Sequence, residues 1–200
     1  TAAIQELVEG SHYSRGLATG SGTDGTIIVS NSESPLRLTG AGNHSKLGEL
    51  IGVVVKEAVK EALFLQTGLC PKKQHSVLRR TKRFGVNEDT IWHKYKDIVG
   101  EVSIMKPQFI HNLHTIDTMD ELVTLTSLYV HLLDQLDWGL LSAEEVVEEG
   151  EMILKRIGEA FDIDMEEQEK LDDIHDMSTD GVVEAMMDKF IEIIAVISVF

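Results

Sequence analysis

Residues 17–24 read Leu-Ala-Thr-Gly-Ser-Gly-Thr-Asp, and residues 43–52 read Asn-His-Ser-Lys-Leu-Gly-Glu-Leu-Ile-Gly. Both stretches are glycine-punctuated loops with side chains that can handle protons. These are Thr23 and Asp24 in the first loop, and His44 and Glu49 in the second. Reactive side chains commonly lie on turns that a rigid scaffold holds in place. We therefore expect the two turns to meet at one edge of a sheet and to form a site.

The residues around these turns predict a mixed fold. The β-branched run at residues 26–30 predicts a short buried strand, and residues 36–39 predict a returning strand after a turn. Residues 45–66 then have a strong helical period. The expected fold class is α/β or α+β, with short strands, glycine-rich loops and a long helix. The apolar stripe of that helix consists of Leu47, Leu50, Ile51, Val54, Ala58 and Ala62.

The remainder of the chain predicts helices alone. Ser/Thr-x-x-Glu pairs, which satisfy backbone donors at helix starts, occur at residues 118–121 and 142–145. Asn87 can cap an earlier helix in the same way. Two further helices are expected at residues 165–176 and 179–198. We therefore divide the chain into a mixed module at residues 1–86 and an all-α, acidic C-terminal module at residues 87–200.

Charge separates the same two modules. Residues 1–86 contain 11 Lys and Arg and 7 Asp and Glu. Residues 87–200 contain 7 Lys and Arg and 27 Asp and Glu. The acidic module would repel phosphates, so no nucleic-acid partner is expected. The basic run at residues 72–83 could bind phosphate or nucleic acid, but it lacks interleaved aromatic residues. Docking to the acidic module is the more economical interpretation of this run.

Cysteine use and hydropathy indicate where the protein works. Cys70 is the single cysteine, so no intrachain disulfide can form and a reducing compartment is expected. No apolar run approaches the roughly 18–20 residues of a membrane-spanning helix. The prediction is a cytoplasmic protein without a membrane span.

Each candidate site residue also has a structural interpretation. The loop before Asp24 could hold an oxyanion, a phosphate or a polar substrate edge, or it could be a plain turn. His44 could act as a general base or could only cap the helix that follows. Glu49 could face the same pocket or lie in solvent. His111 and His114 have a spacing that can hold a metal, but no further ligand is indicated, so we predict no metal and no cofactor.

The two turns resemble a known family. Ala18-Thr-Gly-Ser-Gly-Thr-Asp24, then the stretch from Gly42 to Gly52, and then Ala-Val-Lys-Glu-Ala at residues 58–62, are similar to the motifs of the adenosylcobinamide amidohydrolase (CbiZ) family. Ser21 and Ser45 stand where that family has threonine, so a hydroxyl is kept at both positions. The resemblance covers residues 1–86 and makes no claim on the helical remainder.

The resemblance implies an enzyme of corrinoid salvage in cobalamin biosynthesis, as found in archaea and some bacteria. The implied reaction is hydrolysis of the amide that joins aminopropanol to the corrin ring of adenosylcobinamide, giving adenosylcobyric acid. The catalytic residues that it implies are Asp24, His44, Glu49 and Thr23. The implied substrate-binding residues are Thr19, Gly20, Gly22, Ser45 and Lys46.

The chain departs from the family pattern in two ways. The family has a substantial segment upstream of the residue that corresponds to Thr1, so residues 1–86 resemble only the C-terminal part of its domain. The helical extension after residue 86 is the second departure. Self-association, or association with the missing N-terminal part, is therefore an open expectation. An N-terminal Thr1 nucleophile, activated by its own amino group, is a further hypothesis.

Two other functions remain open from the sequence. The same loops could form a non-catalytic module that binds a corrinoid or a nucleotide. The chain could also be a helical protein-interaction module that retains only a relic of an enzyme. Turnover of adenosylcobinamide, as opposed to binding alone, distinguishes the enzyme from both.

Overall fold

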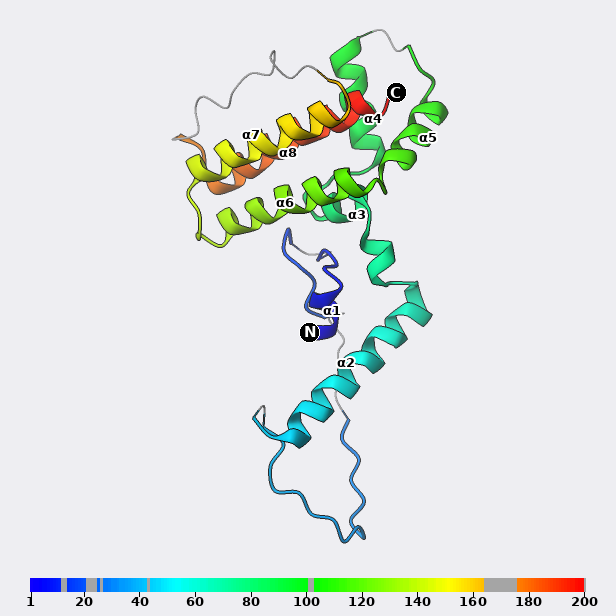
Figure 1. The fold of residues 1–200 in the computed structure, drawn as a ribbon, viewed down its shortest axis with the longest axis vertical. Coiled ribbons are helices and arrows are strands. Elements are labelled where there is room, and N and C mark those ends of the chain that lie inside the picture. Colours follow the sequence, from blue (N-terminus) through cyan, green and yellow to red (C-terminus); the bar gives the residue numbers. More distant parts are fainter. Residues whose placement is uncertain are drawn as a thin grey trace. The chain divides into compact units, whose positions relative to one another are not determined.

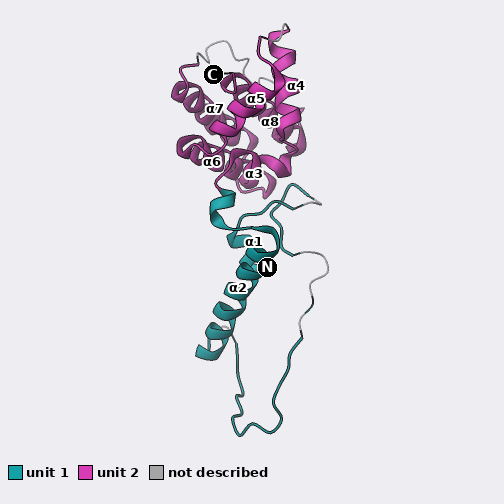
Figure 2. Cartoon of the chain, turned by 90° about the vertical axis from the view of Figure 1, so that its right-hand side faces the viewer, with its two compact units in different colours: residues 1–74 teal, residues 75–200 magenta. Residues whose placement is uncertain are grey.

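The computed structural model describes residues 1–11, 14–20, 25, 27–42, 44–100, 103–163 and 176–199. The chain forms two compact units, residues 1–74 and residues 75–200 (Figure 2). The division falls between Gln74 and His75, whereas the sequence analysis placed a boundary near residue 86. Most of the basic run at residues 72–83 consequently lies in the second unit.

The first unit contains α1 (Ala2–Glu6), α2 (Lys46–Thr67) and the 3-10 helix η1 (Pro71–Gln74), and the described residues between α1 and α2 form no helix (Figure 1). The expected α/β or α+β class is wrong, because the described residues form no strand and only one isolated antiparallel bridge, between Gly10 and Leu17. Residues 27–30 and 36–39 do not pair. Two short strands are marginal without a third strand or a covering helix.

Helix α2 forms as predicted but does not bury its apolar stripe. Ser45 caps its first turn, and Gly68 ends it at φ 71°, a conformation that favours glycine. None of its 22 residues is buried. Leu50, Ile51 and Val54 are 51%, 48% and 65% exposed. The described part of the first unit therefore provides no core for this stripe.

Ion pairs join α1 to α2. The Glu6 carboxylate lies 2.6 Å from Lys56 Nζ and 2.5 Å from Lys60 Nζ. The hydrogen bond from Lys56, followed by that from Lys60, lowers the pKa of Glu6 below its ordinary value. These contacts fix α1 on one side of α2 only.

The second unit is a bundle of helices around a shared apolar core (Figure 1). Helix α4 lies against α8 and α5, α3 packs on α6, and α6, α7 and α8 contact one another. Its elements are α3 (Val77–Thr81), η2 (Lys82–Phe84), α4 (Glu88–Val99), α5 (Lys106–Ile116), α6 (Asp120–Asp137), α7 (Ala143–Ala160) and α8 (Thr179–Ile197).

Aromatic side chains and one glycine organise this core. The Tyr129 ring stacks on Phe190, and its hydroxyl donates to the Met186 carbonyl oxygen at 2.7 Å. Burial raises the pKa of Tyr129 above its ordinary value. A Cβ atom on Gly150 would lie 2.3 Å from Met186 Cε and 3.3 Å from the Tyr129 ring. Glycine at this position therefore lets α7 approach α6 and α8 closely.

The predicted helix starts are confirmed in part. Asn87 and Ser142 accept hydrogen bonds from the first turns of α4 and α7, and each takes part in a capping box. The predicted capping box of Thr118 and Glu121 is wrong, because the N-cap of α6 is Met119, which makes no side-chain cap. The predicted helix at 165–176 lies, up to residue 175, outside the described residues. Helix α8 begins at Thr179, as expected.

Hydropathy agrees with the absence of a predicted membrane span. Among the described residues, no helix combines the length and apolar character needed to cross a bilayer.

A buried ion pair connects η2 to α6. Two guanidinium nitrogens of Arg83 lie 2.6 and 2.7 Å from the two carboxylate oxygens of Asp134. The side chains are only 4% and 13% exposed, and the guanidinium also lies over the Phe84 ring. Breaking a buried pair at one side costs much more than breaking an exposed pair, because a charge remains away from water.

Replacing Asp134→Ala should therefore lower the free energy of unfolding of the second unit by about 3–5 kcal/mol. Asp188→Ala is the control, since Asp188 is 62% exposed in its 2.6 Å pair with Lys94 and should cost about 0–1 kcal/mol. Urea unfolding followed by tryptophan fluorescence measures both. Equal losses for the two variants would contradict this assignment.

Candidate functional site

The first predicted turn begins beside α1. The Ala18 amide donates to the Glu9 carbonyl oxygen at 2.8 Å, and the Thr1 hydroxyl donates to the Thr19 carbonyl oxygen at 2.9 Å. These bonds hold Thr19, and with it the start of the loop, near the beginning of α1. Gly22, Thr23 and Asp24 lie outside the described residues. The expectation that Asp24 meets His44 therefore stays a prediction.

The second predicted turn is held by Ser45. Its hydroxyl accepts a hydrogen bond from the Gly48 amide at 3.0 Å and donates to the Gly42 carbonyl oxygen at 2.8 Å. Its own amide also donates to Gly42, at 2.9 Å. The N-cap of α2 is thus Ser45, and not His44, for which the sequence analysis considered this role. The hydroxyl orders the loop and the first turn of α2 together.

Gly48 is required where the loop crosses α2. A Cβ atom at this position would lie 2.2 Å from the Gly42 carbonyl oxygen and 2.5 Å from that of Ala41. Both neighbours are backbone atoms, which cannot rotate away as the end of a side chain can. By contrast, a Cβ atom on Gly52, one turn later, meets nothing within 4 Å. The glycine in the Leu-Gly-Glu motif therefore has a packing role.

The three polar residues on this turn lie at the surface. His44 is exposed and immediately precedes the capping Ser45. The Lys46 ammonium lies 2.8 Å from the Glu49 carboxylate, with side chains 73% and 58% exposed. In this structure Glu49 makes a surface ion pair with Lys46. Of the predicted site residues, the structure brings Lys46 and Glu49 into contact, and His44 and Ser45 directly precede them in the chain.

The first unit also has a hollow away from these turns. It has a volume of about 360 Å³ and includes Cys70, which is half-buried. None of the predicted site residues lines it. The residues around it are Leu7, Glu57, Lys60, Glu61, Phe64, Leu69, Cys70 and Pro71.

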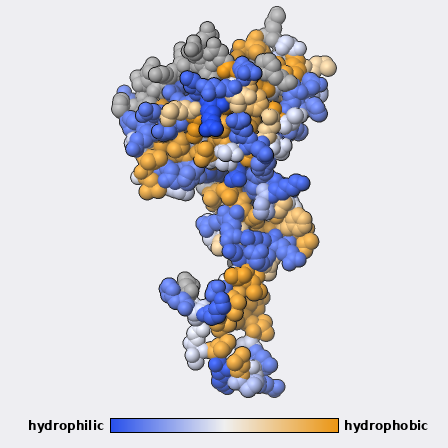
Figure 3. Space-filling view, viewed as in Figure 1, coloured by the Kyte–Doolittle hydropathy of each residue, from blue (hydrophilic) through white to orange (hydrophobic). Residues whose placement is uncertain are grey.

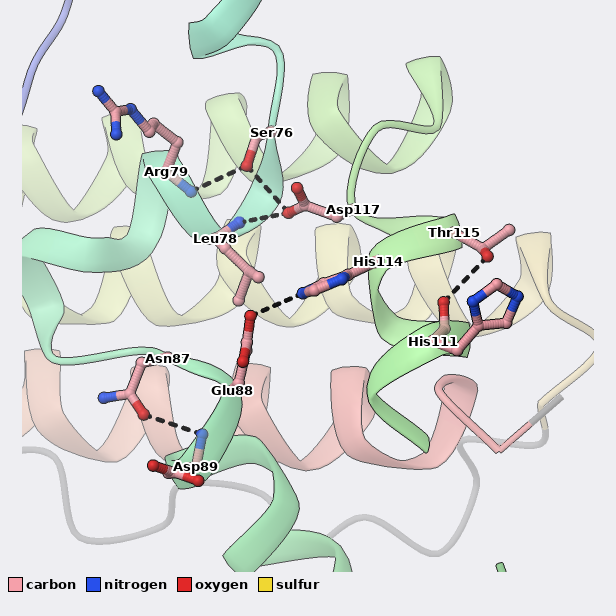
Figure 4. A network of polar contacts seen from close by, with 10 residues as sticks. All are labelled: Ser76, Leu78, Arg79, Asn87, Glu88, Asp89, His111, His114, Thr115 and Asp117. Atoms are coloured by element: carbon pink, nitrogen blue, oxygen red, sulfur yellow. Dashed lines mark hydrogen bonds and ion pairs between the residues drawn. The ribbon is translucent and has the colours of Figure 1, made fainter. Parts of the chain in front are cut away.

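A separate polar network lies in the second unit, around a hollow of about 570 Å³ (Figure 4). The Asp117 carboxylate accepts hydrogen bonds from the Leu78 amide at 2.8 Å and the Ser76 hydroxyl at 3.0 Å, which fixes the start of α3. His114 Nε2 lies 2.6 Å from a Glu88 carboxylate oxygen. Sequence reasoning missed this cluster because its contacts join residues 26 to 41 positions apart in the chain, for which no spacing rule exists.

Two of the described histidines contact other side chains. His114 contacts Glu88, and the ring of His131 meets Trp138 edge-on, with centroids 6.4 Å apart. Within the described part of the chain, no three His, Cys, Asp or Glu side chains are grouped as metal ligands would be. His111 and His114 both lie on α5, where His114 pairs with Glu88.

Two glycine substitutions test the packing of the second turn. Gly48→Ala should displace the loop at Ala41 and lower the free energy of unfolding, since overpacking typically costs about 1–3 kcal/mol. Gly52→Ala should raise it by about 0.5–1 kcal/mol, because alanine favours a helix interior and has room here. Denaturant unfolding followed by far-ultraviolet circular dichroism gives both values. The same sign for both variants would contradict the close approach at Gly48.

One comparison with known proteins bears on these turns. The protein-family model described as adenosylcobinamide amidohydrolase, CbiZ, matches residues 1–71, about a third of the chain. The match includes both predicted turns and nearly all of the first unit. No curated protein and no solved structure matches the chain. Residues 1–71 of this chain are therefore similar to the adenosylcobinamide amidohydrolase family.

Proposed function

We propose that this chain contributes to hydrolysis of the amide that joins aminopropanol to the corrin ring of adenosylcobinamide. The observation that carries the proposal is the family match over residues 1–71, which contains both glycine-punctuated turns. The matched family is one of amidohydrolases. The specific substrate and the residue roles are extended to this chain by the motifs at residues 18–24 and 42–52.

The proposed reaction begins with water. His44 removes a proton from the water as its oxygen attacks the amide carbon. The tetrahedral intermediate then breaks at the C–N bond, and the proton passes to the departing nitrogen. The products are adenosylcobyric acid and aminopropanol. In this scheme Asp24 or Glu49 orients His44, and Thr23 provides a hydroxyl beside the oxyanion.

The N-terminus of α2 supports this scheme electrostatically. Aligned peptide dipoles place partial positive charge at a helix N-terminus, where negative charge is stabilised. His44 lies at that end of a 22-residue helix. The helix N-terminus would therefore stabilise the negative charge that develops on the amide oxygen in the transition state. The exposure of His44 also allows a substrate as large as a corrinoid to reach it.

The remaining predicted residues have supporting roles in the proposal. Ser45 acts by holding the turn, since its hydroxyl already contacts both Gly42 and Gly48. Lys46 would move from Glu49 to a polar group of the substrate. Thr19, Gly20 and Gly22 would line the opposite side of the substrate.

A non-catalytic corrinoid-binding module is the second candidate. The observation that favours it is the surface ion pair between Lys46 and Glu49, which engages the Glu49 carboxylate away from any role in orienting His44. A chain of this kind would bind adenosylcobinamide and leave the amide intact.

The test is chromatographic assay of the full chain with adenosylcobinamide. Cobyric acid should form, and His44→Ala should lower kcat by about 10²–10⁴-fold, the usual contribution of a general base. His93→Ala is the matched control, since His93 is exposed on α4 and should leave kcat unchanged. Full activity in His44→Ala would exclude its role as the base. Saturable binding of adenosylcobinamide without any turnover would support the second candidate.

A further inference from the structure

The outer face of α6 ends in an exposed aromatic and apolar surface. Trp138, the C-cap residue of α6, is 55% exposed, and Leu140 in the turn that follows is 65% exposed. Leu128, earlier on the same helix, is 51% exposed. Figure 3 shows apolar and hydrophilic surfaces side by side at the left of the second unit, where α6 meets α7. We call Leu128, His131, Gln135, Trp138 and Leu140 the α6 patch.

Contacts between neighbours make the α6 patch one continuous surface. Gln135 Nε2 lies 3.2 Å from His131 Nε2, and the His131 ring meets the Trp138 ring edge-on. The Leu140 amide donates to the Gln135 carbonyl oxygen at 2.9 Å, which holds the turn beside the helix. Leu128 lies three residues before His131, so the two side chains are neighbours on the helix surface.

The α6 patch is separate from the core of the second unit. The inward face of α6 is occupied by buried residues such as Leu125, Tyr129 and Leu133, which belong to the shared core. The helix therefore does not need Trp138 or Leu128 for its packing on α7 and α8. Exposed apolar surface of this kind marks interaction sites, and tryptophan is among the residues that contribute most to binding.

The sequence around the α6 patch is strongly acidic. Residues 107–154 contain ten Asp and Glu and no Lys or Arg. This range includes all of α6, the turn after it and most of α7. Asp137 directly precedes Trp138, and Glu144 and Glu145 lie in the first turn of α7. All three are exposed, so negative charge adjoins the apolar surface on both sides of the turn.

The basic residues of α3 and η2 do not neutralise this end of α6. Helix α3 packs on α6, with Leu78 in contact with Asp117 before α6 and Arg83 in contact with Asp134 within it. The backbone between Leu78 and Arg83 therefore lies along the part of α6 that precedes Asp134. Arg83 itself already forms an ion pair with Asp134. The carboxylate of Asp137 lies beyond this pair, next to Trp138.

We propose that the α6 patch binds a basic amphipathic segment of another protein. Apolar side chains of that segment cover Trp138 and Leu140, and its Lys and Arg side chains pair with Asp137 and with the carboxylates at the start of α7. The patch is smaller than the roughly 800 Å² that each partner buries in a standard interface, so the contact is weak and reversible. This inference does not depend on the proposed enzymatic function.

Charge complementarity selects this partner over others. Residues 75–200 contain 11 Lys and Arg and 27 Asp and Glu, so the second unit of another copy would be repelled. Residues 1–74 contain seven of each kind, so the first unit of another copy supplies no excess of positive charge. Nucleic acids and anionic lipid surfaces carry the same sign of charge as the patch and are disfavoured.

Two labelled peptides of opposite charge test the proposal with the full chain. Each has about 14 residues, or four helical turns, with Leu on one face and either Lys or Glu elsewhere. Fluorescence polarisation should show saturable binding of the Lys peptide, weakened by added salt, and no binding of the Glu peptide. Neither peptide contains tryptophan. Binding should shift the protein's tryptophan emission to shorter wavelength through Trp138, since Trp92 is only 8% exposed.

Substitutions then locate the contact. Trp138→Ala should weaken binding of the Lys peptide by about 10–100-fold, and Trp138→Phe should retain most of it. Met105→Ala is the matched control, since Met105 is 77% exposed in the same unit but lies outside the α6 patch. Asp137→Asn should weaken binding, whereas Asp97→Asn, at an exposed position on α4, should not. Circular dichroism of all variants should show equal helix content.

Three results would overturn the proposal. The first is equal binding of the two peptides, or no binding of either. The second is unchanged affinity of Trp138→Ala for the Lys peptide. The third is a chain mass that rises with concentration and that Trp138→Ala returns to 22.2 kDa, the mass of one chain, because a second copy would then occupy the α6 patch.

Discussion

Burial of apolar side chains holds the second unit together and is nearly missing from the first. In the second unit, helices α4 to α8 share a core that includes Ile91, Phe109 and Phe190, all fully buried. In the first unit, α2 has no buried residue. Hydrogen bonds at Ser45 and ion pairs at Glu6 order the first unit locally, but such contacts contribute little net stability when they are exposed to water.

Much of the fold followed from local sequence signals. Caps at Asn87 and Ser142 and the long period of α2 predicted helices that the structure confirms. The strands at residues 26–30 and 36–39 were wrong because a strand depends on its neighbours, and propensity at Ile27 or Val29 cannot supply them. The exposure of α2 could not be read from its sequence for a similar reason. An apolar stripe indicates that a partner is needed and does not say whether the described chain provides it.

The candidate site was predictable only in part. The motif around His44 correctly indicated a capped turn, because Ser45 and Gly48 act through contacts within a few residues. The relation of that turn to Asp24 depends on residues distant in sequence, for which spacing gives no rule. The network at Asp117 and His114 was invisible for the same reason. It is built where α3, α4 and α5 come together.

The contact between α4 and α8 also sets the order in which the second unit can form during synthesis. Helix α4 ends at Val99, whereas α8 begins only at Thr179, so the helix that covers α4 leaves the ribosome about 80 residues later. The nascent chain must carry an uncovered apolar surface on α4 through that interval. Such transiently exposed surface is prone to aggregation and is a substrate for chaperones.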